Sequence, residues 1–160
     1  MGELRWSEVD MAASIVTLPP HRTKNGRAHT IPLSADALEV LRSIPHRNER
    51  DLVFGDGQGG YSGWSKAKAT LDEKLGKGVK PWTLHDLRRT AATRMADSGV
   101  QPHVIEAVLN HVSGHKGGVA GIYNRALYEP EKRTAIDTLA SYVRTARAKA
   151  EGANVTRLRG

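Results

Sequence analysis

The stretch LHDLRRTAATR, residues 84–94, combines basic side chains with the apolar pattern of a helix. His85 and Arg88 are three residues apart, so on a helix they share one face, and Arg89 follows directly. Apolar residues at helical spacing predict a buried stripe beside that face: Leu84, Leu87, Ala91 and Met95. Donor groups at the rim of a core suit an anion. From these residues alone, the anion is either a structural carboxylate or a phosphate.

Three more positions could do chemistry, and each stands at a recognisable place in the pattern. Lys24 directly precedes an Asn-Gly pair, which is a strong signal for a tight hairpin turn, so this lysine is expected at a hairpin tip. His111 is expected where a helix ends, in VLNHVSG, and Tyr123 follows in GIYNR. His115 predicts no metal site with His111, because the intervening Val-Ser-Gly is not helical and no cysteine or acidic partner is near. Tyr128 precedes a loop-like Glu-Pro junction and is expected to be a packing residue.

The elements that must position these residues change along the chain from strands to helices. Residues 4–10, 14–20 and 27–33 have the composition of strands and predict a small antiparallel sheet. Ser34 can cap a helix through Leu41. Further helices are expected over residues 63–74, from Thr83 to Gly99, from Pro102 to Asn110, and over 119–127 and 130–149, before a loose basic tail at 151–160.

Composition narrows the classes of partner. The 160 residues carry a net charge of +7, which favours a polyanion such as nucleic acid. The absence of cysteine excludes disulfides and fits a cytoplasmic location. No apolar run approaches the ~20 residues needed to span a bilayer, so no membrane association is expected.

The order of these segments resembles the catalytic domain of the tyrosine recombinase, or phage integrase, family. Its pattern places a lysine on a β-hairpin, then His-x-x-Arg on a helix, a histidine in a Leu-Gly-His-like triplet, and a nucleophilic tyrosine. The corresponding stretches here are RTKNGRAHTIPLS, LHDLRRTAATR, VLNHVSG and GIYNR, and LRWSEVD resembles the first strand of the family's sheet. The resemblance implies an α+β, mainly helical fold: a three-stranded antiparallel sheet followed by a helical bundle, over residues 1–150.

The resemblance also implies a metal-free and cofactor-free reaction with double-stranded DNA. Tyr123 would attack a scissile phosphate and form a 3′-phosphotyrosyl intermediate, with His85 as base. Arg88 and His111 would hold the phosphate oxygens, and Lys24 would protonate the leaving 5′-oxygen. Other basic residues are candidates for contacts with DNA: Arg22, Arg27, Arg89 and Arg125. Copies of the full-length protein are expected to assemble on DNA, with residues 130–160 packing on a neighbouring protomer.

The family also uses an earlier arginine, followed three residues later by an acidic residue, and the alignment places both before Met1. The resemblance therefore implies an N-terminally truncated catalytic domain. Loss of one phosphate-binding arginine costs ~10²–10³ in rate, by analogy with removal of an oxyanion-hole donor. The alternatives are a DNA-binding remnant without catalytic activity and an enzyme similar to type IB topoisomerases, which use a related residue set.

Overall fold

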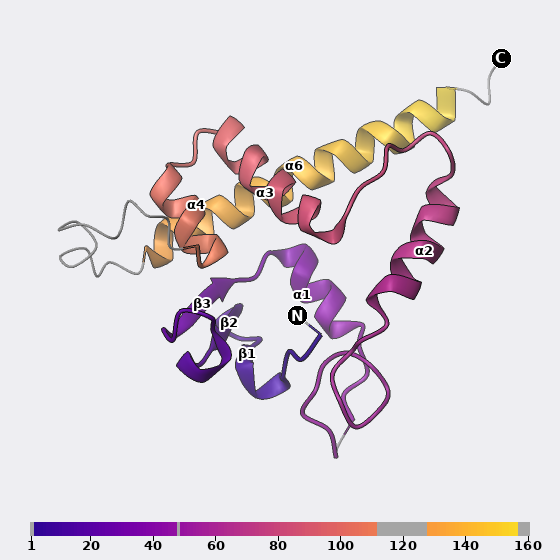
Figure 1. Cartoon of the computed structure of the whole chain (residues 1–160). Coiled ribbons are helices and arrows are strands. Elements are labelled where there is room, and N and C mark those ends of the chain that lie inside the picture. Colours follow the sequence, from indigo (N-terminus) through magenta and orange to yellow (C-terminus); the bar gives the residue numbers. More distant parts are fainter. Residues whose placement is uncertain (1, 48, 112–127, 157–160) are drawn as a thin grey trace.

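The computed structural model describes residues 2–47, 49–111 and 128–156, with side chains as far as residue 152. A small antiparallel sheet comes first along the chain and is followed by five described α-helices (Figure 1). This arrangement confirms the predicted α+β, mainly helical fold. The predicted helix at 119–127 lies outside the described residues.

The sheet has the strand order β1-β2-β3, formed by Val9–Asp10, Ile15–Leu18 and His29–Pro32. The first predicted strand is mostly wrong, because residues Trp6–Glu8 form a 3-10 helix and only two residues pair as β1. The physical reason lies in the Glu8 carboxylate, which accepts the Arg5 N–H at 3.0 Å and turns the chain before the ladder can begin.

The connection between β2 and β3 is also longer than a tight two-residue turn. It runs over residues 19–28 and contains a 3-10 helix, Pro20–Arg22. The ladder ends at Leu18 because the two prolines that follow have no N–H to donate. The Asn-Gly pair does form a turn within this loop, where the Gly26 N–H donates to the Thr23 carbonyl at 3.2 Å.

The five helices begin and end where local signals predict, with one exception. They are α1 (Ala35–Arg42), α2 (Trp64–Leu75), α3 (Leu84–Asp97), α4 (Pro102–Leu109) and α6 (Glu129–Thr156). The Ser34 hydroxyl caps α1 by accepting the Ala37 N–H at 3.2 Å, and Gly99 ends α3 with a φ of 84°. The exception is α6, which continues to Thr156 through residues predicted as a loose tail.

Two separate hydrophobic clusters form the core. One joins the strands to α1 and to the segment after it, around Leu4, Val16, Leu41 and Val53. The other joins α3, α4 and α6, around Met95, Val104, Ile105, Val108 and Ala135. The chain therefore folds as a sheet-bearing part and a helical part, each with its own buried apolar groups.

The buried stripe predicted on α3 is only half correct. Met95 is completely buried, but Leu84 and Leu87 are 41% and 58% exposed. The cause is that α3 packs against α4 and α6 around Ala92 and Met95, in its C-terminal half. Its N-terminal turns, which carry His85 and Arg88, extend beyond that contact.

The two parts of the core are joined along β3, an edge strand of the sheet. Helix α6 packs against this strand, and the Lys132 ammonium, in a side chain only 4% exposed, donates to the Thr30 carbonyl at 2.8 Å. Arg133 donates to the carbonyls of Ala13 at 3.1 Å and Ser14 at 3.2 Å. Lys132 thus satisfies a backbone carbonyl that the edge strand would otherwise leave to water, and Arg133 attaches α6 to the β1–β2 turn.

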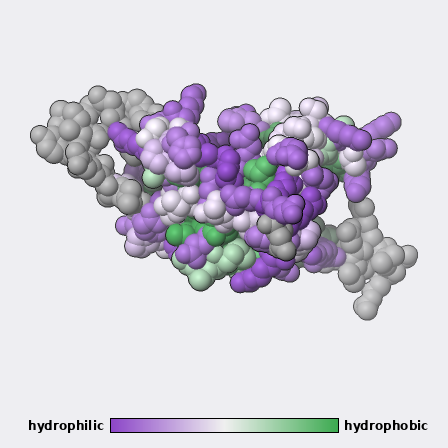
Figure 2. Space-filling model, turned by 90° about the horizontal axis from the view of Figure 1, so that it is seen from below, coloured by the Kyte–Doolittle hydropathy of each residue, from purple (hydrophilic) through white to green (hydrophobic). Residues whose placement is uncertain are grey.

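Hydrophilic side chains predominate on the face shown in Figure 2, and hydrophobic groups there are confined to small patches. No helix in the described part of the chain combines the length and the apolar character that spanning a membrane requires.

Candidate functional site

The last turn of α4 is the point where the elements carrying the predicted site residues meet. A helix ends with carbonyl groups that have no partner within the helix, and these must find donors elsewhere. Here the Arg88 guanidinium, from α3, donates to the Leu109 carbonyl. The Asn25 side-chain amide, from the β2–β3 loop, donates to the Asn110 side-chain oxygen at 2.7 Å. Two distant segments therefore converge directly before His111.

A third donor to this turn comes from β3. The buried imidazole of His29 hydrogen-bonds the backbone of Val108, which acts to raise its pKa. Burial and the positive charge of Lys132 act more strongly in the opposite direction and lower the pKa of His29 below its usual value. Three consecutive residues of α4 and its end, Val108 to Asn110, therefore bind side chains from three different elements.

The backbone at the end of α4 explains why His111 leaves the helix. Asn110 has a φ of 51°, in the left-handed region that asparagine tolerates better than most residues. The His111 N–H then donates to the Glu106 carbonyl at 2.9 Å, which closes the helix end. The His111 side chain is exposed.

The predicted catalytic residues within the described part of the chain are all accessible. Lys24, His85, Arg88 and His111 are each exposed. The contacts at the end of α4 bring together the Lys24 loop, Arg88 and the turn before His111, and His85 lies one helical turn before Arg88 on α3. Tyr123 lies outside the described residues, as do Arg125 and His115.

Two of the arginines predicted to contact DNA are engaged in ion pairs. The Arg22 guanidinium binds the carboxylate of Glu8 at 3.0 Å, and both side chains are largely buried, so this pair anchors the start of the Lys24 loop. Arg89 binds Asp86 at 3.1 Å. Hydrogen bonds from Thr83, with a smaller contribution from Arg89, lower the pKa of the Asp86 carboxyl group. Arg27 is exposed in the loop.

Tyr128, the tyrosine close to Tyr123 in the sequence, has the packing role expected for it. Tyr128 is half-buried, and its ring lies against that of His103 on α4, with centroids 4.9 Å apart. This contact places Tyr128 near the start of α4, whereas the loop contacts lie at the end of that helix.

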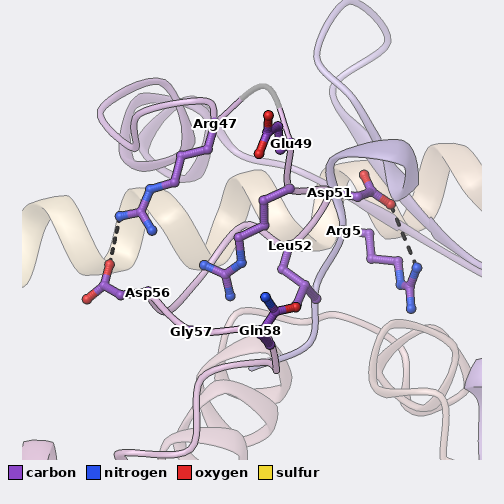
Figure 3. A pocket seen from close by; sticks show the side chains of 9 residues that line it. Arg5, Arg47, Glu49, Asp51, Leu52, Asp56, Gly57 and Gln58 are labelled. Atoms are coloured by element: carbon purple, nitrogen blue, oxygen red, sulfur yellow. Dashed lines mark hydrogen bonds and ion pairs between the residues drawn. The ribbon is translucent and has the colours of Figure 1, made fainter.

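A surface hollow elsewhere in the molecule also contains arginines, but its charges are balanced (Figure 3). Its lining includes three arginines and three acidic residues: Arg5, Arg47, Arg50, Glu49, Asp51 and Asp56. Arg47 binds Asp56 at 2.7 Å, and Arg50 donates to the carbonyls of Phe54 and Gly59. These contacts shape the loop, and the hollow has no excess positive charge for an anion. Among the described residues, no group of three or more histidine, aspartate or glutamate side chains is arranged to hold a metal ion.

Sequence reasoning missed Asn25, His29, Asn110 and Lys132. Asn25 and Asn110 adjoin predicted site residues, but only the fold shows that their side chains meet. A histidine within a β-branched strand and a lysine near the start of a long helix have no distinctive local pattern. Their burial against other elements is the property that marks them.

The chain is similar in sequence to known proteins of one family. Residues 1–129 match the phage integrase family, and the chain belongs to that family. It is 33% identical to prophage integrase IntA of Escherichia coli over 91% of this chain, and 31% identical to prophage integrase IntZ of the same organism over 87%. The integrase of Shigella phage Sf6 is 26% identical over 83%. The chain spans about a third of the length of these relatives, 34–35%. No solved structure matches it.

Proposed function

We propose that this chain is the catalytic part of a site-specific DNA recombinase that cuts and rejoins strands through Tyr123. The observation that carries the proposal is the convergence at the end of α4. There the Lys24 loop and Arg88 contact the turn that leads into His111. Family membership and the net charge of +7 support DNA as the substrate.

In the proposed reaction, the Tyr123 hydroxyl attacks the scissile phosphorus and His85 takes its proton. The new bond joins the tyrosine oxygen to phosphorus, and the bond from phosphorus to the 5′-oxygen breaks. Lys24 gives a proton to the departing 5′-oxygen. The energy of the broken bond is kept in the 3′-phosphotyrosyl linkage, so a 5′-hydroxyl can later reverse the step without a cofactor.

Arg88 is suited to bind the phosphate because it is exposed and its guanidinium has five N–H donors, of which the Leu109 contact uses only a part. That contact also fixes the plane of the guanidinium before DNA arrives. A donor held in place in advance stabilises the charge that develops on the phosphate oxygens without reorganising during the reaction. His111 would add a second donor from the adjacent turn.

The test is the formation of a covalent protein–DNA adduct that survives denaturation. The chain is incubated with radiolabelled DNA from a prophage attachment site, nicked so that the short cleaved fragment diffuses away and the adduct accumulates. We expect an adduct with the wild-type chain and with Tyr128→Phe, and none with Tyr123→Phe. Tyr128→Phe is the matched control, since it removes a nearby phenol from a packing residue.

Other outcomes separate the alternatives. An adduct that forms with Tyr123→Phe but not with Tyr128→Phe would overturn the assignment of the nucleophile. DNA binding with no adduct from any variant would favour a non-catalytic DNA-binding protein. Relaxation of supercoiled plasmids that lack an attachment site would favour a topoisomerase-like activity.

Assembly of several copies on DNA is part of the same proposal. The exposed side chains of Tyr142 and Val143 on α6 support a contact with another protomer. Light scattering on the DNA complex should give a mass above that of one chain, and a strictly monomeric complex would contradict this part.

A further inference from the structure

We propose that Asn25 and Asn110 are positioning residues, which hold Lys24 and His111 in register for strand cleavage. This inference rests on the proposed function. The juxtaposition that carries it is a single hydrogen bond of 2.7 Å between residues 85 positions apart. Asn25 is the immediate neighbour of Lys24, and Asn110 is the immediate neighbour of His111, so this bond links two candidate catalytic groups through one residue on each side.

The Asn25 end of this link is held by its own loop. The Asn25 side-chain oxygen accepts the Arg27 N–H at 3.2 Å, which leaves its amide group to donate to Asn110. The Thr23 hydroxyl donates to the Arg27 carbonyl at 2.7 Å across the same turn. With Arg22 fixed by Glu8 at the start of the loop, the Asn110 contact fixes the segment that carries Lys24.

The Asn110 end combines two requirements in one residue. Its φ of 51° demands a residue that tolerates the left-handed region, which glycine and asparagine do. Glycine would meet the backbone requirement but would offer no acceptor to Asn25. The asparagine side chain is therefore explained by the contact across the site, and not by the end of α4 alone.

The position of the contact favours a role in catalysis over a role in stability. Arg88 and His29 already hold Leu109 and Val108, so the end of α4 remains attached when the Asn25 contact is lost. The loop tip has no comparable second attachment to α4 among the described residues. Loss of the contact should therefore release Lys24 more than it loosens the fold, and misplacement of a reacting group by about 1 Å can cost ~10²-fold in rate.

Two variants remove the contact and keep each residue's local role. Asn25→Ser retains an oxygen that can accept the Arg27 N–H, but it is too short to reach α4. Asn110→Gly retains the left-handed backbone and removes the acceptor. The matched control is Gln101→Ala, which deletes an exposed amide side chain at the opposite end of α4.

The first readout does not depend on activity. In ¹⁵N–¹H spectra of the 160-residue chain, Asn25→Ser should shift the backbone amide signal of His111, and Asn110→Gly should shift that of Lys24. Gln101→Ala should shift neither. Absence of both cross-effects would overturn the inference, whatever the chain does to DNA.

The second readout is the rate of adduct formation at saturating DNA. Each single variant should be about 10- to 100-fold slower, with a Kd for DNA within about twofold of wild type, and the double variant should be no slower than the slower single variant. Additive losses, an unchanged rate, or a loss of affinity that accounts for the loss of rate would each overturn the positioning role. A wild-type chain that forms no adduct would instead overturn the proposed function, and this role with it.

Discussion

The buried imidazole of His29 should make the stability of the fold depend on pH, and His29→Gln should remove this dependence. His29 is 7% exposed, and burial is the largest cause of its lowered pKa, followed by the positive charge of Lys132. Glutamine carries an amide N–H that can replace the contact with Val108, but it does not titrate. The substitution therefore tests the charge of the side chain more than its hydrogen bond.

The sign follows from the direction of the pKa shift. A histidine whose pKa is lowered in the folded state binds a proton more readily when the chain is unfolded. Its contribution to stability is therefore complete above the ordinary histidine pKa of 6.5 and is lost as the pH falls toward the folded value. Between these two pKa values, unfolding takes up at most one proton at His29. The free energy of unfolding therefore changes by at most about 1.4 kcal/mol per pH unit.

Carboxyl groups such as that of Asp51 affect stability in a more acidic pH range than His29 does. Hydrogen bonds from Ser7 lower the pKa of Asp51 below its usual value, which is already acidic, so its contribution to stability is lost only at more acidic pH. The two effects are separable if measurements stay above about pH 5.

The assay is urea unfolding followed by circular dichroism, at intervals from about pH 8 to about pH 5, for the wild-type chain and His29→Gln. The free energy of unfolding of the wild type minus that of His29→Gln should be constant above pH 6.5. Below pH 6.5 this difference should become less favourable to the wild type. A difference that stays constant throughout, or that favours the wild type as the pH falls, would refute the assignment of a buried neutral imidazole.

Three more predictions follow from burial and exposure. Lys132→Met should lower the free energy of unfolding by about 1.5–3 kcal/mol, because it removes a charged donor to Thr30 from a buried position; a change within about 0.5 kcal/mol in urea unfolding would contradict this. Met95→Ala should cost about 2–5 kcal/mol in the same assay, whereas Leu87→Ala, at an exposed position, should change stability by less than about 0.5 kcal/mol. Arg27→Ala should reduce the slope of log K against log salt for DNA binding by about 1, and an unchanged slope would place Arg27 away from the phosphates.

The helices were predictable because their signals are local. Ser34 caps α1, Pro102 starts α4 and Gly99 follows the end of α3, each through an interaction within a few residues of sequence. The resemblance to the recombinase family added the order of the elements. Neither kind of reasoning needed to know how α3, α4 and α6 pack.

The sequence-based predictions are wrong where a contact distant in sequence, or a competing local turn, determines the structure. The Trp6–Glu8 segment has the alternating pattern of a strand. The Glu8 carboxylate instead accepts the Arg5 N–H, and the segment forms a 3-10 helix. Leu87 has the spacing of a core residue, but α3 packs against α4 and α6 around Ala92 and Met95, and Leu87 stays exposed. Spacing predicts which residues share a face, whereas packing decides how much of that face is buried.

The candidate site lies on the seam between the two hydrophobic clusters, and this location gives several of its residues two functions. Arg88 attaches α3 to the end of α4 and, in the proposed reaction, would also bind the phosphate, while β3 holds His29 under the same turn and binds Lys132 at its edge. The Lys132–Thr30 and Asn25–Asn110 hydrogen bonds therefore connect the sheet-bearing part to the helical part. Because hydrogen bonds depend on direction more strictly than apolar contacts do, such a seam fixes the relative position of the two parts well. That combination suits the proposed site, in which Lys24 and His111 come from different parts of the core and would act on one phosphate.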